Sequence, residues 1–136
     1  MSTIYTEISL KNAFDVEKAE EGIITEQEIR QTTVKALVDT GAWTLVINEK
    51  VREKLGLKIK GTDWATLADG KRETFNLTAP IEVIWKDRRA ICTALVLPNA
   101  DEVLLGAIPL ETLDLMIHPR TETLVGAHGD QPVHRV

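Results

Sequence analysis

The stretch VKALVDTGAWTLVI, residues 34–47, is the part of this sequence that decides its fold. Two apolar runs, 36–38 and 45–47, have the composition of buried strands, and Asp39, Thr40 and Gly41 stand between them. A surface loop could hold these three residues at little cost. Here we expect the flanking strands to draw the carboxylate toward the interior. Burial of an ionised carboxylate is unfavourable unless the group is paired, so the pattern indicates chemistry at Asp39.

Length and composition describe one globular domain without disulfides. The chain has 136 residues, of which 43% are hydrophobic, and its single cysteine, Cys92, lies in an apolar run that predicts a buried, unreactive thiol. The net charge of −5 argues against general binding of nucleic acid or anionic membranes, because both need a cationic face. No signal peptide and no apolar run of about 20 residues is found. We therefore expect a cytoplasmic protein with no nucleic-acid or membrane partner.

Alternating and apolar runs predict an all-β domain of seven or eight strands. The expected strands and hairpins cover 3–10, 30–39, 62–77 with a two-residue turn at Asp69-Gly70, 79–98 with KDRR (86–89) as a solvated turn, and 115–125 with a turn at 118–121. We expect one domain over residues 1–125 and a flexible tail over 126–136.

Two short helices are predicted from their end signals. Asn48 is an N-cap residue and Gly56 a C-terminal stop, which indicates a helix between them. Pro109 suits the first turn of a second helix that follows the strand-like Val103-Leu104-Leu105 and Gly106. The acidic stretch 15–22 is typical of a solvated turn or a short helix.

This pattern resembles the retropepsin-like aspartic proteases over about residues 34–125. The resemblance implies a small closed barrel with one or two short helices, assembled as a homodimer. It implies that Asp39 is the catalytic carboxylate, that the Thr40 hydroxyl clasps the partner loop, and that Gly41 allows a close backbone approach. Ala42 would line the edge of this active-site loop. Leu104, Leu105 and Gly106 would support the loop from beneath, and Ala68, Asp69 and Gly70 would form the flap over the substrate.

The chemistry of such a site needs two carboxylates. A pair held close together shares one proton, so that one member activates water and the other polarises the scissile carbonyl of a peptide or protein substrate. No cofactor and no metal is required. The motif occurs once in the chain, so the second carboxylate has to come from Asp39 of a second copy. We expect a homodimer, with residues 3–10 as a candidate interface strand.

Two departures from the family pattern affect function. Position 42 is Ala where pepsin-like enzymes have a Ser that stabilises the charged aspartate, so we expect a pH optimum at about pH 5–6. The flap has a charged tip and Trp64 near its base, unlike the glycine-rich flaps of viral enzymes.

Other functions remain open at this stage. A turn after a strand can also cradle phosphate, as in actin-like ATPases, but those folds are several times longer. A second alternative is a catalytically silent retropepsin-fold module that dimerises or binds peptides. Asp39 could also be a plain turn or capping residue. His118, His128, His134 and Cys92 are too widely spaced to predict a zinc site.

Overall fold

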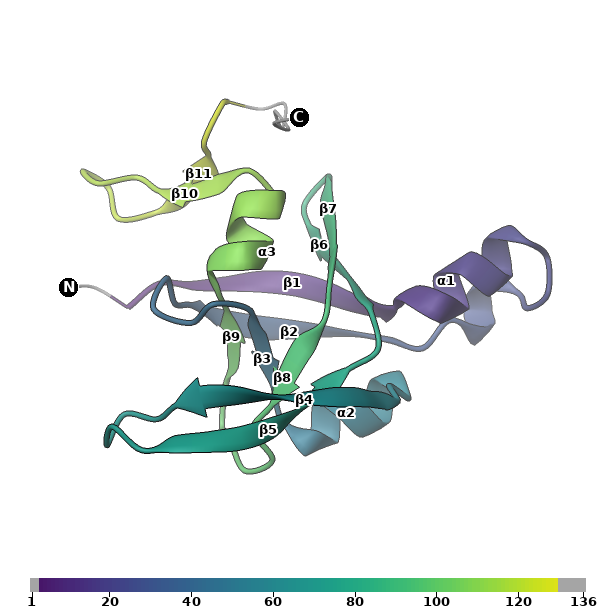
Figure 1. The fold of residues 1–136 in the computed structure, drawn as a ribbon. Helices are drawn as coiled ribbons and strands as arrows, with labels where there is room; N and C mark the ends of the chain where they lie inside the picture. The colour runs from purple at the N-terminus through teal and green to yellow at the C-terminus, as the bar shows by residue number, and fades with distance from the viewer. Residues whose placement is uncertain (1–2, 130–136) are drawn as a thin grey trace.

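The computed structural model describes residues 3–129, which are mostly β with short helices (Figure 1). Nine strands form one sheet in the order β4-β5-β8-β3-β9-β2-β1-β6-β7, and β10 pairs with β11 in a second sheet. The mostly β class is confirmed, with eleven strands in the described part rather than seven or eight. The strands are β1 Tyr5–Asn12, β2 Gln31–Val38, β3 Leu45–Ile47, β4 Ile59–Thr66, β5 Arg72–Thr78, β6 Ile81–Trp85, β7 Arg88–Cys92, β8 Ala94–Val96, β9 Val103–Leu105, β10 Leu115–Ile117 and β11 Leu124–Gly126. The helices are α1 Ala13–Glu20, α2 Glu49–Leu55, α3 Ala107–Thr112 and the 3-10 turn η1 Glu26–Glu28.

The main sheet is open, which corrects the expectation of a closed barrel. Strand β4 pairs with β5 and strand β7 with β6, so β4 and β7 are the edges of the sheet. One residue, Thr93, separates β7 from β8, yet β8 pairs with β3 and β5 near the other end of the strand order. The sheet therefore curls back on itself where β7 continues into β8 (Figure 1). Closure would need a ladder between the two edge strands, and in the described residues none joins them.

The helices begin and end largely where local signals predict. The Asn48 side chain accepts a hydrogen bond from the Val51 N–H at 2.9 Å, and Gly56 ends α2 at a φ of 61°. Pro109 lies in the first turn of α3, as predicted, and the acidic stretch contributes an eight-residue helix, α1. No helix within residues 3–129 is long and apolar enough to cross a membrane.

The turn of the β4–β5 hairpin differs from the predicted two-residue turn. The Leu67 N–H donates to the Lys71 carbonyl at 2.8 Å, which leaves a three-residue loop of Ala68, Asp69 and Gly70. Gly70 has a φ of 85° and its N–H donates to the Leu67 carbonyl. In three-residue hairpin loops of this kind, a type I turn is followed by a glycine with left-handed backbone angles. The turn position of Gly70 was therefore predicted, but the loop is one residue longer than predicted.

The predicted solvated turn KDRR is also corrected. Lys86 and Asp87 are exposed and form the turn, with Lys86 at a φ of 53°. Arg88 instead begins β7 and is only 4% exposed. Its guanidinium donates to the carbonyls of Leu113 and Asp114 at 3.1 and 2.9 Å, so a buried arginine ties the sheet to the end of α3.

Strand β1 lies inside the sheet rather than at an edge. Residues 5–11 pair with β2, and residues 9–12 also pair with β6. The second half of the strand therefore has both sides occupied. This limits its expected role as an interface strand to its first half.

The hydrophobic core lies within the curled sheet and is closed by α2 and α3. Leu10, Ile81 and Val83 come from the β1–β6 end and are fully buried. Leu45 and Leu105, next to the 39–44 and 106–108 segments, are equally buried. The core thus reaches to the base of the loop that follows β2.

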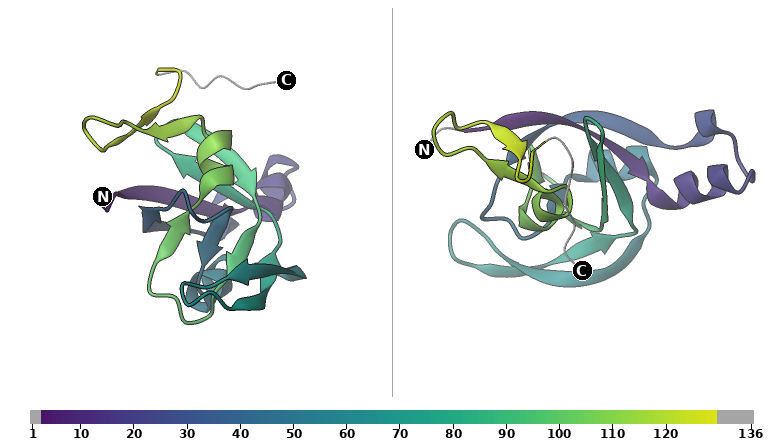
Figure 2. Two further views of the ribbon diagram at one scale, coloured as in Figure 1. Left: turned by 60° about the vertical axis from the view of Figure 1, so that its left-hand side comes forward. Right: turned by 90° about the horizontal axis from the view of Figure 1, so that it is seen from above.

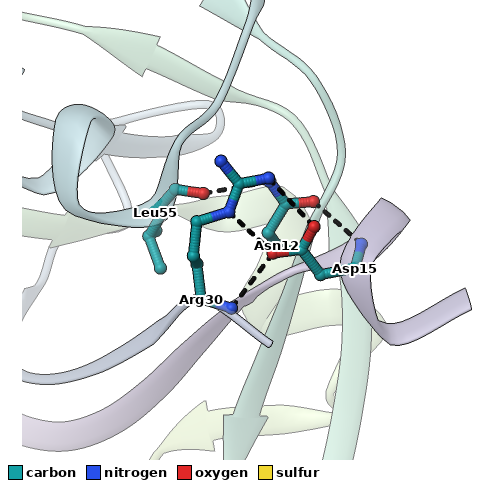
Figure 3. A network of polar contacts seen from close by, with 4 residues as sticks. All are labelled: Asn12, Asp15, Arg30 and Leu55. Atoms are coloured by element: carbon teal, nitrogen blue, oxygen red, sulfur yellow. Dashed lines mark hydrogen bonds and ion pairs between the residues drawn. The ribbon is translucent and has the colours of Figure 1, made fainter. Parts of the chain in front are cut away.

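The segment between β1 and β2 is fastened to the body by a polar network (Figure 3). Asp15, buried on α1, accepts hydrogen bonds from the Arg30 backbone N–H and from its Nε and Nη2 at 2.8–3.0 Å. The Asn12 side chain accepts from the Asp15 N–H and donates to the Leu55 carbonyl at 2.9 Å. These bonds hold α1 against the ends of β2 and α2.

We expect Asp15→Asn to lower the free energy of unfolding at pH 7 by about 1–3 kcal/mol, because Arg30 loses its charged acceptor. The hydrogen bond from Arg30 lowers the pKa of the Asp15 carboxyl below its ordinary value of 3.8. A lowered folded pKa means that the stabilisation is complete above the unfolded pKa and is lost as the pH falls through the folded one. Urea unfolding at pH 7 and in acid below the folded pKa of Asp15 should therefore show the variant and the parent converging in acid. Glu17→Gln, exposed on the same helix, is the control, and an equal loss at both pH values would contradict this account.

Candidate active site

Asp39 is the first residue beyond the parallel pairing of β2 with β9. In that ladder Leu37 lies opposite Leu104 and Val38 opposite Leu105. The Asp39 N–H then donates to the Leu105 carbonyl at 3.0 Å, which fixes where the loop leaves the sheet. The structure thus brings Asp39 together with Leu104 and Leu105, the pair that the resemblance places beneath the loop.

Within the loop, one backbone donor orients the Asp39 side chain and a second fixes its backbone carbonyl. The Gly41 N–H donates to Asp39 Oδ1 at 2.9 Å, and the Ala42 N–H donates to the Asp39 carbonyl at 3.1 Å. A Cβ on Gly41 would lie 3.1 Å from Asp39 Oδ1, closer than an ordinary contact. Glycine therefore allows this backbone to approach the carboxylate.

The carboxylate lies nearer the surface than expected. Asp39 is half-buried, and Thr40 and Gly41 are exposed, whereas the flanking Val38 and Leu45 are 8% and 0% exposed. The apolar strands end at the sheet boundary, and the loop continues past it. In a single chain, β2 and β3 therefore fix the ends of the loop but leave the Asp39 carboxylate partly open to solvent.

The first turn of α3 supports the loop, because its N–H groups donate hydrogen bonds to loop carbonyls. The Ala107 N–H donates to the Ala42 carbonyl at 2.8 Å, and the Ile108 N–H donates to the Trp43 carbonyl at 3.0 Å. The first N–H groups of a helix have no partner within the helix, so the loop supplies one for each. Gly106 is buried at this contact, where a Cβ would lie 2.2 Å from the Thr44 carbonyl oxygen.

Thr44 has a structural role that the sequence analysis did not identify. It is 2% exposed, and its hydroxyl donates to the Thr93 carbonyl at 3.1 Å. A threonine directly before a buried apolar strand is the only signal that the sequence offered. Trp43 points outward with 41% of its surface exposed, and half-buried Ala42 lies beside it in the loop.

Next to the loop is a cavity of about 690 Å³. It is lined by Thr40, by the outer face of α3, by β10 and by His128. Ile108 and Met116 contribute apolar surface there and are 45% and 42% exposed. Within residues 3–129 the Thr40 hydroxyl has no hydrogen-bond partner, so the expected clasp stays a prediction about two chains.

The β4–β5 hairpin and the 39–44 loop project toward the same side of the molecule (Figures 1 and 2). Ala68, Asp69 and Gly70 at its tip are exposed. Trp64 is 58% exposed. The Arg72 guanidinium lies over the Trp64 ring, with 5.2 Å between Arg72 Cζ and the centre of the ring. The hairpin tip makes a polar contact within itself, from the Lys71 N–H to Asp69 Oδ1 at 2.9 Å.

The first residues of the expected tail are held in place, and residues 130–136, with His134, lie outside the described part. Arg88 Nη2 donates to the Gly129 carbonyl, and His128 Nδ1 lies 2.6 Å from Asp114 Oδ1. Residues 126–129 therefore pack against the end of α3 and against β7.

Other reactive groups do not gather at the loop. Burial raises the pKa of the Cys92 thiol to about 12, so it is protonated at neutral pH and is no nucleophile. Among residues 3–129 no three His, Cys, Asp or Glu side chains lie together in a way that could hold a metal ion.

A family model agrees with the motif. The family described as gag-polyprotein putative aspartyl protease matches residues 25–134, a span that includes the 39–44 loop, the β4–β5 hairpin and α3. Among solved structures, a retropepsin-like aspartic protease from Rickettsia conorii is 20% identical, with 86% of this chain and 88% of that chain covered and a TM-score of 0.46. No curated protein matched the sequence significantly.

Proposed function

Since this chain belongs to the gag-polyprotein putative aspartyl protease family, we propose that it is an aspartic endopeptidase whose catalytic pair is formed by Asp39 from two copies. The observation that carries the proposal is the Asp39 loop itself. Its carboxylate is oriented by the Gly41 N–H, and its backbone is fixed to Leu105 and to the first turn of α3. Proton-transfer catalysis requires a carboxyl group that is held in position, and the fixed backbone of this loop holds Asp39 in that way.

In the proposed reaction the two carboxylates share one proton. The ionised carboxylate takes a proton from water while the water oxygen attacks the peptide carbonyl carbon, and the protonated carboxylate gives its proton to the carbonyl oxygen. The resulting diol then collapses. One carboxyl group protonates the leaving nitrogen as the C–N bond breaks, and the other carboxylate takes a proton from the diol, which restores the single shared proton.

A second copy is needed because the chain has one Asp-Thr-Gly sequence. The solvent exposure of residues in and around the loop supports the need for a second copy. Thr40 and Gly41 are open to solvent, and Trp43, Ile108 and Met116 expose 41–45% of their surfaces nearby. A face with apolar side chains around a half-buried acid is suited to packing against its own copy, with the Thr40 hydroxyl as the expected contact between the two loops.

A digest of mixed peptides by the full chain tests this function. We expect cleavage that is strongest at about pH 5–6, is inhibited by pepstatin, and falls in specific rate on dilution as dimers dissociate. An optimum below about pH 3 would contradict the expectation drawn from Ala42. A stable dimer that cleaves no peptide at any pH would instead favour the silent binding module.

A further inference from the structure

The β10–β11 hairpin is a small sheet of its own, and one of its edges is uncovered. Within residues 3–129, β10 pairs only with β11, in a register that sets Leu115 opposite Gly126 and Ile117 opposite Leu124. An isolated pair of strands is only marginally stable in water. The free edge of β10 is therefore a candidate for further strand pairing.

The hydrogen bonds at the two ends of the hairpin show which backbone groups face that edge. The Ala127 N–H donates to the Asp114 carbonyl at 2.8 Å, and the His118 N–H donates to the Thr123 carbonyl at 2.7 Å. Hydrogen-bonded pairs alternate with non-hydrogen-bonded pairs in an antiparallel ladder, so the N–H and carbonyl groups of Ile117 point away from β11. No hydrogen bond joins these two groups to another part of the described chain.

Strand β10 lacks the charged side chains that commonly keep strand edges from pairing. The edge strand β4 is IKGTDWAT and the edge strand β7 is RRAIC, whereas β10 is LMI. Met116 in β10 is 42% exposed. Leu115 is 6% exposed and its side chain lies in the core, so half-buried Ile117 is the position that a partner strand can reach.

The partner that fits this edge is a second copy of the chain. This inference rests on the proposed function, in which two Asp39 carboxylates meet on a two-fold axis. Thr40 lines the same cavity as Met116 and Ile117, so an axis beside the Asp39 loop also passes close to β10. Figures 1 and 2 show the β10–β11 hairpin and the β2–β3 loop on the same side of the molecule.

We propose that β10 of each copy pairs with β10 of the other across this axis, which makes one sheet of four strands in the order β11-β10-β10-β11. The pairing is antiparallel, because a two-fold axis perpendicular to the sheet reverses the strand direction. Ile117 lies at the centre, where its N–H donates to the Ile117 carbonyl of the second copy and its own carbonyl accepts in return. Pro119, which has no N–H, ends the ladder two residues later. The exposed apolar side chains of Ile108 and Met116 lie beside this edge and are covered by the second copy.

A cysteine placed at the centre of this ladder tests the register. In the full chain, we expect Ile117→Cys to form a disulfide-linked dimer on mild oxidation, because hydrogen-bonded antiparallel partners have Cα atoms about 5.5 Å apart, within the span of a disulfide. Met116→Cys is the matched control, since position 116 faces His118 of the second copy and should cross-link at least about tenfold more slowly. Glu7→Cys, on the free half of β1, tests the other candidate interface strand. The parent chain gives the background from Cys92, whose thiol is protonated at neutral pH.

Proline substitutions on the two edges of the hairpin test the backbone hydrogen bonds. Ile117→Pro removes the N–H that donates across the axis, and Leu124→Pro removes an N–H from the far edge of β11. Both side chains pack against the core, so the lost side-chain contacts are matched. In sedimentation experiments, we expect Ile117→Pro to raise the dimer dissociation constant by at least about tenfold and Leu124→Pro to leave it unchanged. Circular dichroism checks that each chain is folded.

Cross-linking at Glu7 but not at Ile117, or equal rates at Ile117 and Met116, overturns the proposal. So do equal effects of the two prolines, and a parent chain that stays monomeric. A dimer cross-linked at Ile117 that cleaves no peptide contradicts proteolysis but leaves the interface in place. Peptide cleavage by a chain that forms no cross-link at Ile117 does the reverse.

Discussion

Replacing Asp39 by Asn is expected to reduce kcat/KM for peptide cleavage by about 10⁴-fold, because neither copy can then hold or exchange the shared proton. The fold should survive. The Asn side chain keeps an oxygen that can accept the Gly41 N–H, and the Asp39 backbone contacts to Leu105 and Ala42 do not involve the side chain. Peptide cleavage assays, circular dichroism and sedimentation on the same preparation measure activity, folding and assembly together.

Asp87→Asn is the matched control, since Asp87 is an exposed aspartate in the β6–β7 turn. It should leave cleavage unchanged. Mixing the parent protein with excess Asp39→Asn chain gives a sharper test, because a mixed dimer holds one carboxylate and should be inactive. Activity that follows only the amount of parent chain, despite subunit exchange, would rule out a catalytic pair shared between copies.

Features encoded by neighbouring residues were predictable from the sequence. Helix α2 was one, since Asn48 and Gly56 act on backbone groups within a few positions of themselves. The contact between the Asp39 loop and Leu105 joins residues far apart in the chain, and only the resemblance to retropepsin-like proteases implied it. The hydrogen bonds from the first turn of α3 to the Ala42 and Trp43 carbonyls were not anticipated.

Features that depend on distant contacts were missed. Arg88 reads as part of a basic turn, and its burial arises from carbonyls of Leu113 and Asp114, 25 and 26 positions away. The run 90–98 reads as one strand, yet the chain breaks pairing at Thr93 and moves to another ladder. Whether a curled sheet closes depends on the course of its edge strands, which no local pattern specifies. The exposure of Asp39 likewise depends on how far the loop extends beyond the sheet.

Gly106→Ala is expected to lower the free energy of unfolding by about 2–4 kcal/mol and to reduce cleavage even where the chain stays folded. The cause is steric rather than conformational, because Gly106 has an ordinary φ of −88°. The added Cβ would lie 2.2 Å from the Thr44 carbonyl oxygen and 2.6 Å from that of Ala42. Both are backbone atoms, so relief requires the 42–44 segment to move away from α3.

That movement would break the hydrogen bonds from the Ala107 and Ile108 N–H groups that hold the Asp39 loop. Gly61→Ala is the control, because a Cβ at Gly61 meets nothing within 4 Å and its change in stability should stay within about 0.5 kcal/mol. Urea unfolding gives the stability of each variant. Cleavage assays at urea concentrations well below the unfolding midpoint distinguish displacement of the loop from unfolding of the whole chain. A Gly106→Ala chain as stable and as active as the parent would mean that the loop tolerates displacement from α3, and that rigidity at this contact is not what makes Asp39 effective.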